Sequence, residues 1–275
     1  MIDTVRTLLF VPGNRSERFA TAMAAGADLT VVDLEDAVPR ADKDAARAGV
    51  AAWLDTLAGA DAQRVVVRIN AAGTPWHEAD LQAVAARAAG VMLAKAEAGT
   101  ALSSAAARTP VIALIETAAG VLDARPIAAT PGVVRLAFGS FDLAAELGID
   151  PLEAEVLRPS RCALVLASAA AGLPGPIDGV HAAIDDDEAL AAETDAARRL
   201  GFTAKLCVHP RQITTVSSVL RPTAEELAWA QRILAAAHAA AQGGVVTVDG
   251  RMVDKPVIDR ARRIAAAVTP KGPKA

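Results

Sequence analysis

Acidic side chains stand at the ends of short apolar runs in this sequence. In VIALIET (111–117), five apolar residues are followed directly by Glu116. A short run of Val, Ile, Ala and Leu is typical of a strand buried on both faces, where a carboxylate without a partner is strongly unfavourable. Taken alone, Glu116 could simply cap the next helix. Whether it belongs to a site instead depends on how the other runs end.

The same pattern recurs along the chain. Polar or charged residues follow the other runs in this order: Pro12-Gly13-Asn14, Asp33-Leu34-Glu35-Asp36, Arg68 with Asn70, Lys95, Gly139-Ser140-Phe141-Asp142, Asp178 and His209-Pro210. If the runs are parallel strands of one barrel, their carboxyl ends meet at a single mouth, where catalytic groups gather. Helix capping would explain one or two of these residues but not the whole series. We therefore assign Glu116 to a site.

Glu116 and Asp142 are the residues from which we infer a metal site. They follow neighbouring runs and are expected to face each other across the mouth. The sequence has no Cys and His set with zinc spacing, and carboxylate oxygens are hard ligands that suit Mg²⁺ or Mn²⁺. Arg68 is expected opposite, where its planar fork can hold a carboxylate at two points. A metal, a carboxylate clamp and no nucleophile with a paired base favour enolate chemistry, in which a cation stabilises the developing oxyanion.

The strands that would position these groups are the apolar runs themselves. We count eight, the seventh of them weak: 7–11, 29–35, 64–70, 90–94, 111–116, 133–139, 176–180 and 204–210. Most are separated by segments rich in Ala, Arg, Glu and Leu that are long enough for one or two helices. Strands alternating with helices predict right-handed βαβ units and a parallel sheet. Eight units without a Gly-rich dinucleotide-binding turn predict an α/β fold of the closed (β/α)₈ TIM-barrel type.

The chain continues beyond the eighth run. We predict a helix over 223–241, a small hairpin over 243–256 and a last helix over 258–268, followed by a disordered tail at 269–275. The domain prediction is therefore a barrel with the catalytic mouth at 1–215 and a C-terminal helical and hairpin extension at 216–275.

Composition excludes several classes of function. Aromatic residues make up only 3% of the chain and Tyr is absent, so a surface for stacking nucleic-acid bases is not expected. The net charge of -4 provides no basic stripe for nucleic acid and no polybasic patch for a membrane. Without a signal peptide or an apolar stretch of membrane-spanning length, we expect a cytoplasmic protein. Cys162 and Cys207 are expected to be reduced core residues.

Seven motifs, taken together, carry a family resemblance that extends from Arg6 to about Ala261. In chain order they are LLFVPGNRSERF, VVDLEDAVP with a following Lys, VVVRIN, IALIETAAGV, FGSFDL, IDGV and KLCVHPRQI. This set resembles the citrate lyase beta-subunit-like CoA-ester lyases of the HpcH/HpaI aldolase/citrate lyase superfamily, which also includes malyl-CoA and citramalyl-CoA lyases. Any one motif alone would be weak, but their order is specific.

The resemblance implies a set of roles. It implies a barrel that is usually trimeric, with Mg²⁺ bound by Glu116 and Asp142 and the 2-oxo or hydroxy acid held by Arg68. Glu35 and Asp36 resemble groups that order metal-bound water and Arg68. The segment GRMVDKP resembles the family's C-terminal motif, and this implies that Asp254 reaches a neighbouring subunit's site and exchanges a proton with the acetyl-CoA methyl group or its enolate.

Arg15 and Arg18 are the candidate residues for binding the phosphates of coenzyme A. They open the first helix beside the PGN turn, whose amides and helix N-terminus suit a phosphate. The sequence departs from the family at Thr21, where a Lys is frequent, and this removes one positive charge from the same region. Ala94 and Ala204 also replace residues that are common in the family.

Other residues receive a structural interpretation. His209 is expected to be a hydrogen-bonding residue at the end of the eighth strand, and His77, His181 and His238 are expected on the surface. Lys95 could form a Schiff base, as in other barrel aldolases, but the metal acids make that redundant.

The sequence therefore predicts a Mg²⁺-dependent carbon–carbon lyase or synthase. Its expected partners are a hydroxyacyl-CoA of the citryl, malyl or citramalyl type, an acyl-CoA and a 2-oxo acid. Two alternatives remain at this point. One is a metal-dependent aldolase that acts on free hydroxy-oxo acids without CoA, and the other is a lyase subunit that needs an acyl-carrier partner.

Overall fold

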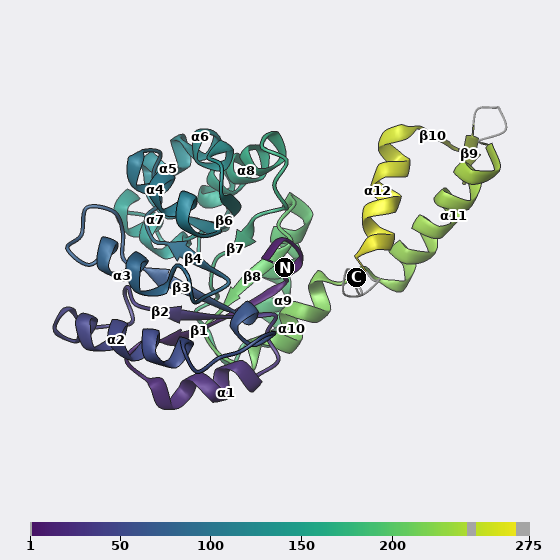
Figure 1. Ribbon diagram of the computed structural model, residues 1–275. Helices are drawn as coiled ribbons and strands as arrows, with labels where there is room; N and C mark the ends of the chain where they lie inside the picture. The colour runs from purple at the N-terminus through teal and green to yellow at the C-terminus, as the bar shows by residue number, and fades with distance from the viewer. Residues whose placement is uncertain (1, 241–245, 268–275) are drawn as a thin grey trace. The chain divides into compact units, whose positions relative to one another are not determined.

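Eight parallel strands close into a barrel in the computed structural model, which describes residues 2–240 and 246–267 (Figure 1). Each strand pairs with the next one in sequence, and β1 pairs with β8 to close the ring. The bounds are β1 (Thr7–Pro12), β2 (Leu29–Asp33), β3 (Val65–Ile69), β4 (Gly90–Leu93), β5 (Val111–Ile115), β6 (Val133–Phe138), β7 (Ile177–Asp178) and β8 (Ala204–Cys207). The predicted TIM barrel is confirmed, and all eight apolar runs contain its strands.

Helices surround the barrel on its outer face (Figure 1). The α-helices of this part are α1 (Phe19–Ala24), α2 (Lys43–Leu54), α3 (His77–Val84), α4 (Thr100–Arg108), α5 (Ala118–Leu122), α6 (Ala124–Ala129), α7 (Ser140–Leu147), α8 (Ala154–Ala170), α9 (Asp187–Leu200) and α10 (Gln212–Leu220). The 3₁₀ turns are η1 (Ile2–Thr4), η2 (Ser16–Arg18), η3 (Arg40–Asp42) and η4 (Ala62–Arg64). Because helices cover one face of each strand and the barrel interior covers the other, every residue of β2 and β5 is buried.

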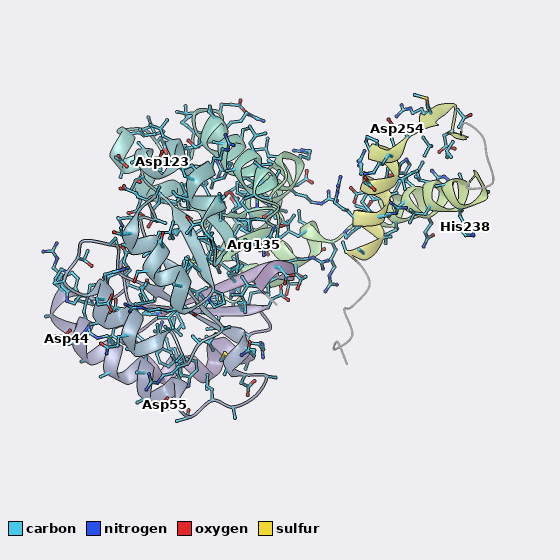
Figure 2. All side chains as sticks on the ribbon, turned by 45° about the horizontal axis from the view of Figure 1, so that its top comes forward. Asp44, Asp55, Asp123, Arg135, His238 and Asp254 are labelled. Carbon is cyan, nitrogen blue, oxygen red and sulfur yellow. The ribbon has the colours of Figure 1, made fainter. Side chains whose placement is uncertain are left out.

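The barrel interior is filled by aliphatic side chains, among them Leu8, Val31, Val66 and Ile112. Its amino-terminal end is closed by one fully buried arginine, Arg135 near the start of β6 (Figure 2). The guanidinium donates hydrogen bonds to groups that precede β1, β7 and β8, namely the carbonyl oxygens of Ile2 (3.0 Å), Val5 (2.9 Å) and Gly175 (3.0 Å) and the hydroxyl of Thr203 (2.7 Å).

Burial lowers the pKa of Arg135 to about 10, so the side chain stays charged at neutral pH. Arg135 closes the amino-terminal end of the barrel, and all strands of the barrel are parallel. Ligands therefore enter at the mouth formed by the carboxyl ends of the strands.

The chain divides into two compact units, Met1–Ser217 and Ser218–Ala275. In the second unit, α11 (Ala224–Ala240) and α12 (Lys255–Ala266) pack against each other, and β9 (Val246–Val248) pairs with β10 (Arg251–Val253). The turn between these strands is Asp249-Gly250, and both residues have left-handed φ values (50° and 73°), as a two-residue hairpin turn requires. The unit has an apolar cluster of its own, which includes Ala230, Ile233, Val253 and Ala261.

The sequence predictions for the second unit can be followed over its described part. The helix predicted at 223–241 is α11, and the hairpin is found within 246–253. The last helix begins at Lys255 rather than at 258, because Asp254 caps it: its carboxylate accepts a hydrogen bond from the amide of Val257 (3.2 Å). Residues 243–245 of the predicted hairpin and the predicted tail at 269–275 lie outside the described residues. Across the described ranges, no helix has the length and apolar character that crossing a membrane requires.

Candidate active site at the carboxyl end of the barrel

Glu116 follows the last residue of β5 and is only 2% exposed. It does not cap the following helix. That role belongs to Thr117, whose hydroxyl accepts a hydrogen bond from the amide of Gly120 (3.0 Å) at the start of α5. The carboxylate of Glu116 instead accepts a hydrogen bond from the backbone amide of Lys95 (2.9 Å), which fixes it from the neighbouring strand end. Glu116 is thus held in the mouth and does not act as a helix cap.

Asp142 lies in the first turn of α7, beside Glu116, and is half-buried. The turn between β6 and α7 passes so close to Glu116 that a side chain at Gly139 would collide with the Cβ atom and a carboxylate oxygen of Glu116. This close approach places the two carboxylates side by side. Burial, and then the charge of Asp142, raises the pKa of Glu116 to about 8. The nearby positive charges therefore do not fully neutralise the carboxylates of Glu116 and Asp142.

Arg68 lies near the end of β3 with one edge of its guanidinium already occupied. Its Nε donates to one carboxylate oxygen of Asp33 (2.7 Å) and its Nη2 donates to the other (2.6 Å), while Nη1 lies 3.2 Å from Glu35. Burial acts against the charge, but the adjacent Asp33 carboxylate raises the pKa of Arg68, so the guanidinium is a permanent cation. The two-point contact predicted for a substrate carboxylate is made within the protein by Asp33. What remains for a ligand is the Nη1 side of the fork.

Glu35 and Asp36 both approach Arg68, as the sequence led us to expect, but differently. Glu35 is buried, and burial raises its pKa, although the nearby Arg68 charge opposes this. Asp36 is exposed, and its carboxylate is 3.8 Å from Nη1 of Arg68. Glu35 is thus part of the buried charge network, whereas Asp36 lies at its edge.

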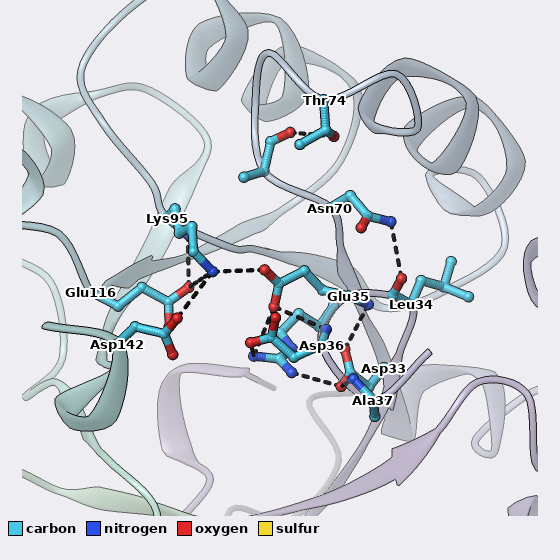
Figure 3. A network of polar contacts seen from close by, with 12 residues as sticks. Asp33, Leu34, Glu35, Asp36, Ala37, Asn70, Thr74, Lys95, Glu116 and Asp142 are labelled. Carbon is cyan, nitrogen blue, oxygen red and sulfur yellow. Dashed lines mark hydrogen bonds and ion pairs between the residues drawn. The ribbon is translucent and has the colours of Figure 1, made fainter. Parts of the chain in front are cut away.

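Lys95 joins the two halves of this network (Figure 3). Its ammonium lies 2.8 Å from Glu35, 3.2 Å from Asp142 and 3.9 Å from Glu116. Burial by itself would lower the pKa of Lys95, but the hydrogen bond to Glu35 and the charges of Glu116, Glu35 and Asp36 raise it. A protonated amine is a poor nucleophile, so the geometry disfavours a Schiff base at this residue. The network as a whole has five carboxylates and two cations: Asp33, Glu35, Asp36, Glu116 and Asp142 with Arg68 and Lys95.

A pocket of about 60 Å³ opens directly at these residues and is lined by Arg68, Glu116, Gly139 and Asp142 together with apolar side chains. A larger pocket of about 310 Å³ lies alongside, with walls that include residues of α8 and α9. The two pockets share Ser140, Phe141 and Val180. The smaller pocket holds the charges expected for chemistry, and the larger one has room for the rest of a ligand.

The donor set fits Mg²⁺ or Mn²⁺. Mg²⁺ is usually held by one or two carboxylates, with water and substrate oxygens completing its shell. Glu116 and Asp142 supply such a pair, and the raised pKa of Glu116 reflects a charge that a cation would neutralise. In the described part of the chain, no cluster of three or more His, Cys, Asp or Glu residues suited to a metal is found.

Asp33 was the main residue without an assigned role in the sequence analysis. It precedes Glu35 by two residues, and its importance follows from strand register, because Asp33 and Arg68 are directly paired neighbours on β2 and β3. Its carboxylate also accepts hydrogen bonds from the amides of Glu35 (2.8 Å) and Ala37 (3.1 Å). Asp33 therefore fixes both Arg68 and the loop that carries Glu35.

Asp178 was placed among the mouth residues by its position at a strand end, and this expectation was wrong. It is 1% exposed and is bound by Lys205 (2.8 Å) and Arg161 (3.1 Å). Lys205 also contacts Glu193, which in turn contacts His181. The positive charges of Lys205 and Arg161 lower the pKa of Asp178 despite its burial. This buried network ties the end of β7 to β8, α8 and α9, and Asp178 is fully paired within it.

Two of the histidines expected on the surface are buried. His77 donates a hydrogen bond from Nδ1 to the carbonyl oxygen of Asn70 (2.9 Å), and His181 pairs with Glu193 (2.6 Å). His238 is exposed, as predicted. Short polar contacts of this kind cannot be read from isolated His positions in the sequence.

Arg15 and Arg18 are exposed beside the PGN turn, but the turn itself offers little to a phosphate. The amide of Gly13 donates to the carbonyl of Asp33 (2.7 Å), and the amide of Arg15 donates to that of Pro12 (3.0 Å). The guanidinium of Arg15 contacts Glu17 (2.6 Å). Phosphate binding in this region would therefore rely on the two arginine side chains.

The raised pKa of Glu116 leads to a prediction about stability without metal. In the folded protein the carboxyl keeps its proton up to about pH 8, whereas its ordinary pKa is 4.5. Stability should therefore fall as pH rises from 4.5 to 8, because the unfolded chain loses this proton first. Glu116→Gln mimics the protonated form and should raise Tm in EDTA increasingly from pH 5 to pH 8, by about 2–4 °C for each kcal/mol in a domain of this size.

Thermal unfolding followed by circular dichroism at five pH values between 5 and 9 measures this effect. The matched control is Glu146→Gln, which changes an exposed acid one turn further along α7. A difference in Tm between Glu116→Gln and the wild type that stays constant with pH would contradict the raised pKa.

The chain as a whole is similar to proteins of one known family. A model of the HpcH/HpaI aldolase/citrate lyase family matches residues 6–210. The chain is 43% identical over 260 residues to the citrate lyase subunit beta-like protein of Mycobacterium tuberculosis, covering 92% of each chain. It is 36% identical over 274 residues to (3S)-malyl-CoA thioesterase of Cereibacter sphaeroides, covering 95% of this chain and 93% of the relative.

Two solved structures are also similar. One is the protein CitE of M. tuberculosis in complex with magnesium, acetoacetate and coenzyme A, with a TM-score of 0.84, 39% identity and coverage of 97% of this chain and 99% of that one. The other is the citrate lyase beta subunit of M. tuberculosis complexed with oxaloacetate and magnesium, with a TM-score of 0.72, 41% identity and coverage of 80% and 98%.

Proposed function

The chain belongs to the HpcH/HpaI aldolase/citrate lyase family and is a lyase, and on this premise we propose that it is a Mg²⁺-dependent lyase or synthase acting on a hydroxyacyl-CoA. In the cleavage direction the products are an acyl-CoA and a 2-oxo acid. The substrate class is a citryl-, malyl- or citramalyl-like thioester. We also propose a cytoplasmic location, where coenzyme A is available and Cys162 and Cys207 stay reduced.

One observation carries this proposal: the paired carboxylates Glu116 and Asp142 share a mouth with a guanidinium that is held rigidly by Asp33. Related proteins support the ligand classes, because one has been solved with magnesium, acetoacetate and coenzyme A and another with oxaloacetate and magnesium. The three ligand types are a divalent ion, an oxo acid and coenzyme A. The mouth contains or borders a candidate binding group for each of them.

The residues of this chain take the following roles in the proposed reaction. Glu116 and Asp142 would hold the divalent ion, which supplies charge neutralisation for the oxygen of the 2-oxo acid. The Nη1 side of Arg68, which also approaches Glu35 (3.2 Å), binds the carboxylate of that acid, and Asp33 keeps the guanidinium oriented. Arg15 and Arg18 bind phosphates of coenzyme A.

Cleavage also requires an acid that protonates the enolate carbon of the acyl-CoA. The hydroxyl group of the hydroxyacyl-CoA gives its proton to solvent water at the open mouth, the carbon–carbon bond breaks, and the bonding electrons form the enolate of the acyl-CoA. That enolate carbon then takes up a proton. We assign this proton to Asp254 of a neighbouring subunit in a homotrimer, with residues 216–275 packing on or over that neighbour.

The activity is tested with a panel of acyl-CoA and 2-oxo acid pairs, incubated with Mg²⁺ and followed by mass spectrometry. A new hydroxyacyl-CoA, or its cleavage in the reverse direction, is the expected result. Activity on free hydroxy-oxo acids that persists without CoA would replace the proposal with a CoA-independent aldolase. Activity only after an acyl-carrier protein is added would indicate a subunit of a larger complex. Release of free CoA without carbon–carbon cleavage would indicate hydrolysis, as the name of one relative suggests.

The role of Asp254 can be tested by mixing two inactive variants. Glu116→Ala and Asp254→Ala are each expected to be inactive, but subunit exchange should restore part of the activity. Mixed oligomers then contain some interfaces that pair an intact Glu116 with an intact Asp254. Turnover of the mixture, compared with that of each variant alone, is the measurement.

Two outcomes would contradict this assignment. Normal turnover of Asp254→Ala alone would leave Asp254 only its observed role as the cap of α12. An exchanged mixture with no activity would place the acid in the same subunit as the metal site.

A further inference from the structure

Lys95 has an unusual backbone for its position. Its φ is +47°, and within residues 2–240 and 246–267 the other non-glycine residue with left-handed φ is Asp249 in the hairpin turn. A side chain disfavours this conformation, and such residues persist where the surroundings impose them, often at functional sites. At Lys95 the conformation directs the amide to Glu116 and allows the ammonium to reach Glu35 and Asp142. Backbone and side chain thus both serve the acids of the mouth.

The same ammonium makes the ion pairs of both proposed metal ligands. Glu116 and Asp142 each pair with Lys95, and Asp142 is the closer of the two. Arg68 is committed to Asp33 and approaches Glu35. Without Lys95, the buried carboxylate of Glu116 would face that of Asp142 with little positive charge between them.

A divalent ion and this ammonium compete for the same oxygens. Both are cations drawn to Glu116 and Asp142, and two positive charges at one place repel strongly where water is scarce. Glu35 offers the ammonium a position away from the pair, because it already lies 2.8 Å from it. The ammonium therefore has two contacts that the ion would contest, with Glu116 and Asp142, and one that it can keep, with Glu35.

We propose that Lys95 is an internal counter-cation that occupies Asp142 in the metal-free protein and is displaced toward Glu35 when the divalent ion binds. This inference rests on the proposed metal site. Lys95 thereby stabilises the empty site and lowers the affinity for the ion, so that the protein folds with its acids in place before metal arrives.

The direction in which Mn²⁺ affinity changes when Lys95 is replaced separates this role from a structural one. Lys95→Met removes the competing charge, and Lys95→Gln does so while keeping a hydrogen-bond donor for Glu35. Both variants should bind Mn²⁺ at least about tenfold more tightly than the wild type, because one close like charge is gone. Binding is measured without substrate, from the EPR signal of free Mn²⁺ during titration, with Mg²⁺ as competitor. If Lys95 only held the acids in place, its removal would weaken binding.

Stability gives a second readout. In EDTA both variants should have a lower Tm than the wild type, and saturating Mn²⁺ should raise their Tm more than it raises that of the wild type. Arg211→Met is the matched control, because it removes an exposed positive charge after β8 that pairs with Asp185 and not with the mouth acids. Its Mn²⁺ affinity should stay at the wild-type value.

The possible failures are distinguishable. Mn²⁺ affinity that is unchanged or weaker in both Lys95 variants, with clear binding by the wild type, overturns the counter-cation role and leaves the metal site intact. The absence of Mn²⁺ binding by the wild type and by every variant overturns both the counter-cation role and the proposed function.

Discussion

Replacing Glu116 or Asp142 by alanine is expected to reduce Mg²⁺-dependent turnover by about a thousandfold, the order found when a group that stabilises a developing oxyanion is removed. Each variant loses one of the two carboxylates that the mouth offers to a divalent ion. The barrel should remain folded, because both side chains border a pocket and their removal relieves repulsion between like charges. Turnover on the best substrate pair and thermal unfolding of the same samples measure the two parts of this expectation.

Glu146→Ala provides the matched control for these variants. It removes an acid from α7, one turn beyond Asp142, whose carboxylate contacts the amide of Ala118 (3.0 Å) outside the pocket. Its turnover should remain near that of the wild type. Wild-type turnover of Glu116→Ala or Asp142→Ala in the presence of EDTA would exclude a catalytic metal at this site.

Arg68→Lys is expected to reduce kcat/KM for the 2-oxo acid by about a hundredfold or more, mainly through a higher KM. The structure changes the reason for this expectation. A lysine keeps the charge but cannot contact both oxygens of Asp33, so the cation would lose its orientation toward the substrate. Asp33→Asn should raise KM in the same direction, because it weakens the same contact from the other side.

Steady-state kinetics with the 2-oxo acid as the varied substrate measures both effects. Arg87→Lys is the control, because Arg87 also pairs with a carboxylate, Asp55 (2.7 Å), but on the exposed surface. An unchanged KM in Arg68→Lys would assign Arg68 a structural role only.

The barrel and the two acids proposed to bind the metal were accessible to sequence reasoning for a physical reason. Strands buried on both faces must be apolar throughout, so the first charged residue after each run marks the carboxyl end of a strand. Glu116 and Asp142 are found in this way, because each is the first charged residue after a recognisable strand. Arg68 is found similarly, as the charged interruption near the end of β3.

The remaining features of the site depend on strand register and backbone conformation, which the spacing of residues in the sequence does not reveal. The pairing of Asp33 with Arg68 requires the register between β2 and β3, which is set by the whole barrel. The role of Lys95 depends on a left-handed backbone that its neighbours in sequence do not predict. Asp178 was misplaced because β7 has only two residues, and so short a run shows no alternation that would tell a free acid from a paired one.

Arg135 also affects the route by which substrates enter the barrel and products leave it. Because its guanidinium ties together the chain ends beneath β1, β7 and β8, the barrel has no rear exit, and substrates and products must pass through one opening. If the 2-oxo acid binds at Arg68 and the acyl-CoA binds nearer the opening, as proposed, the thioester would have to leave first. A high concentration of acyl-CoA would then slow release of the 2-oxo acid.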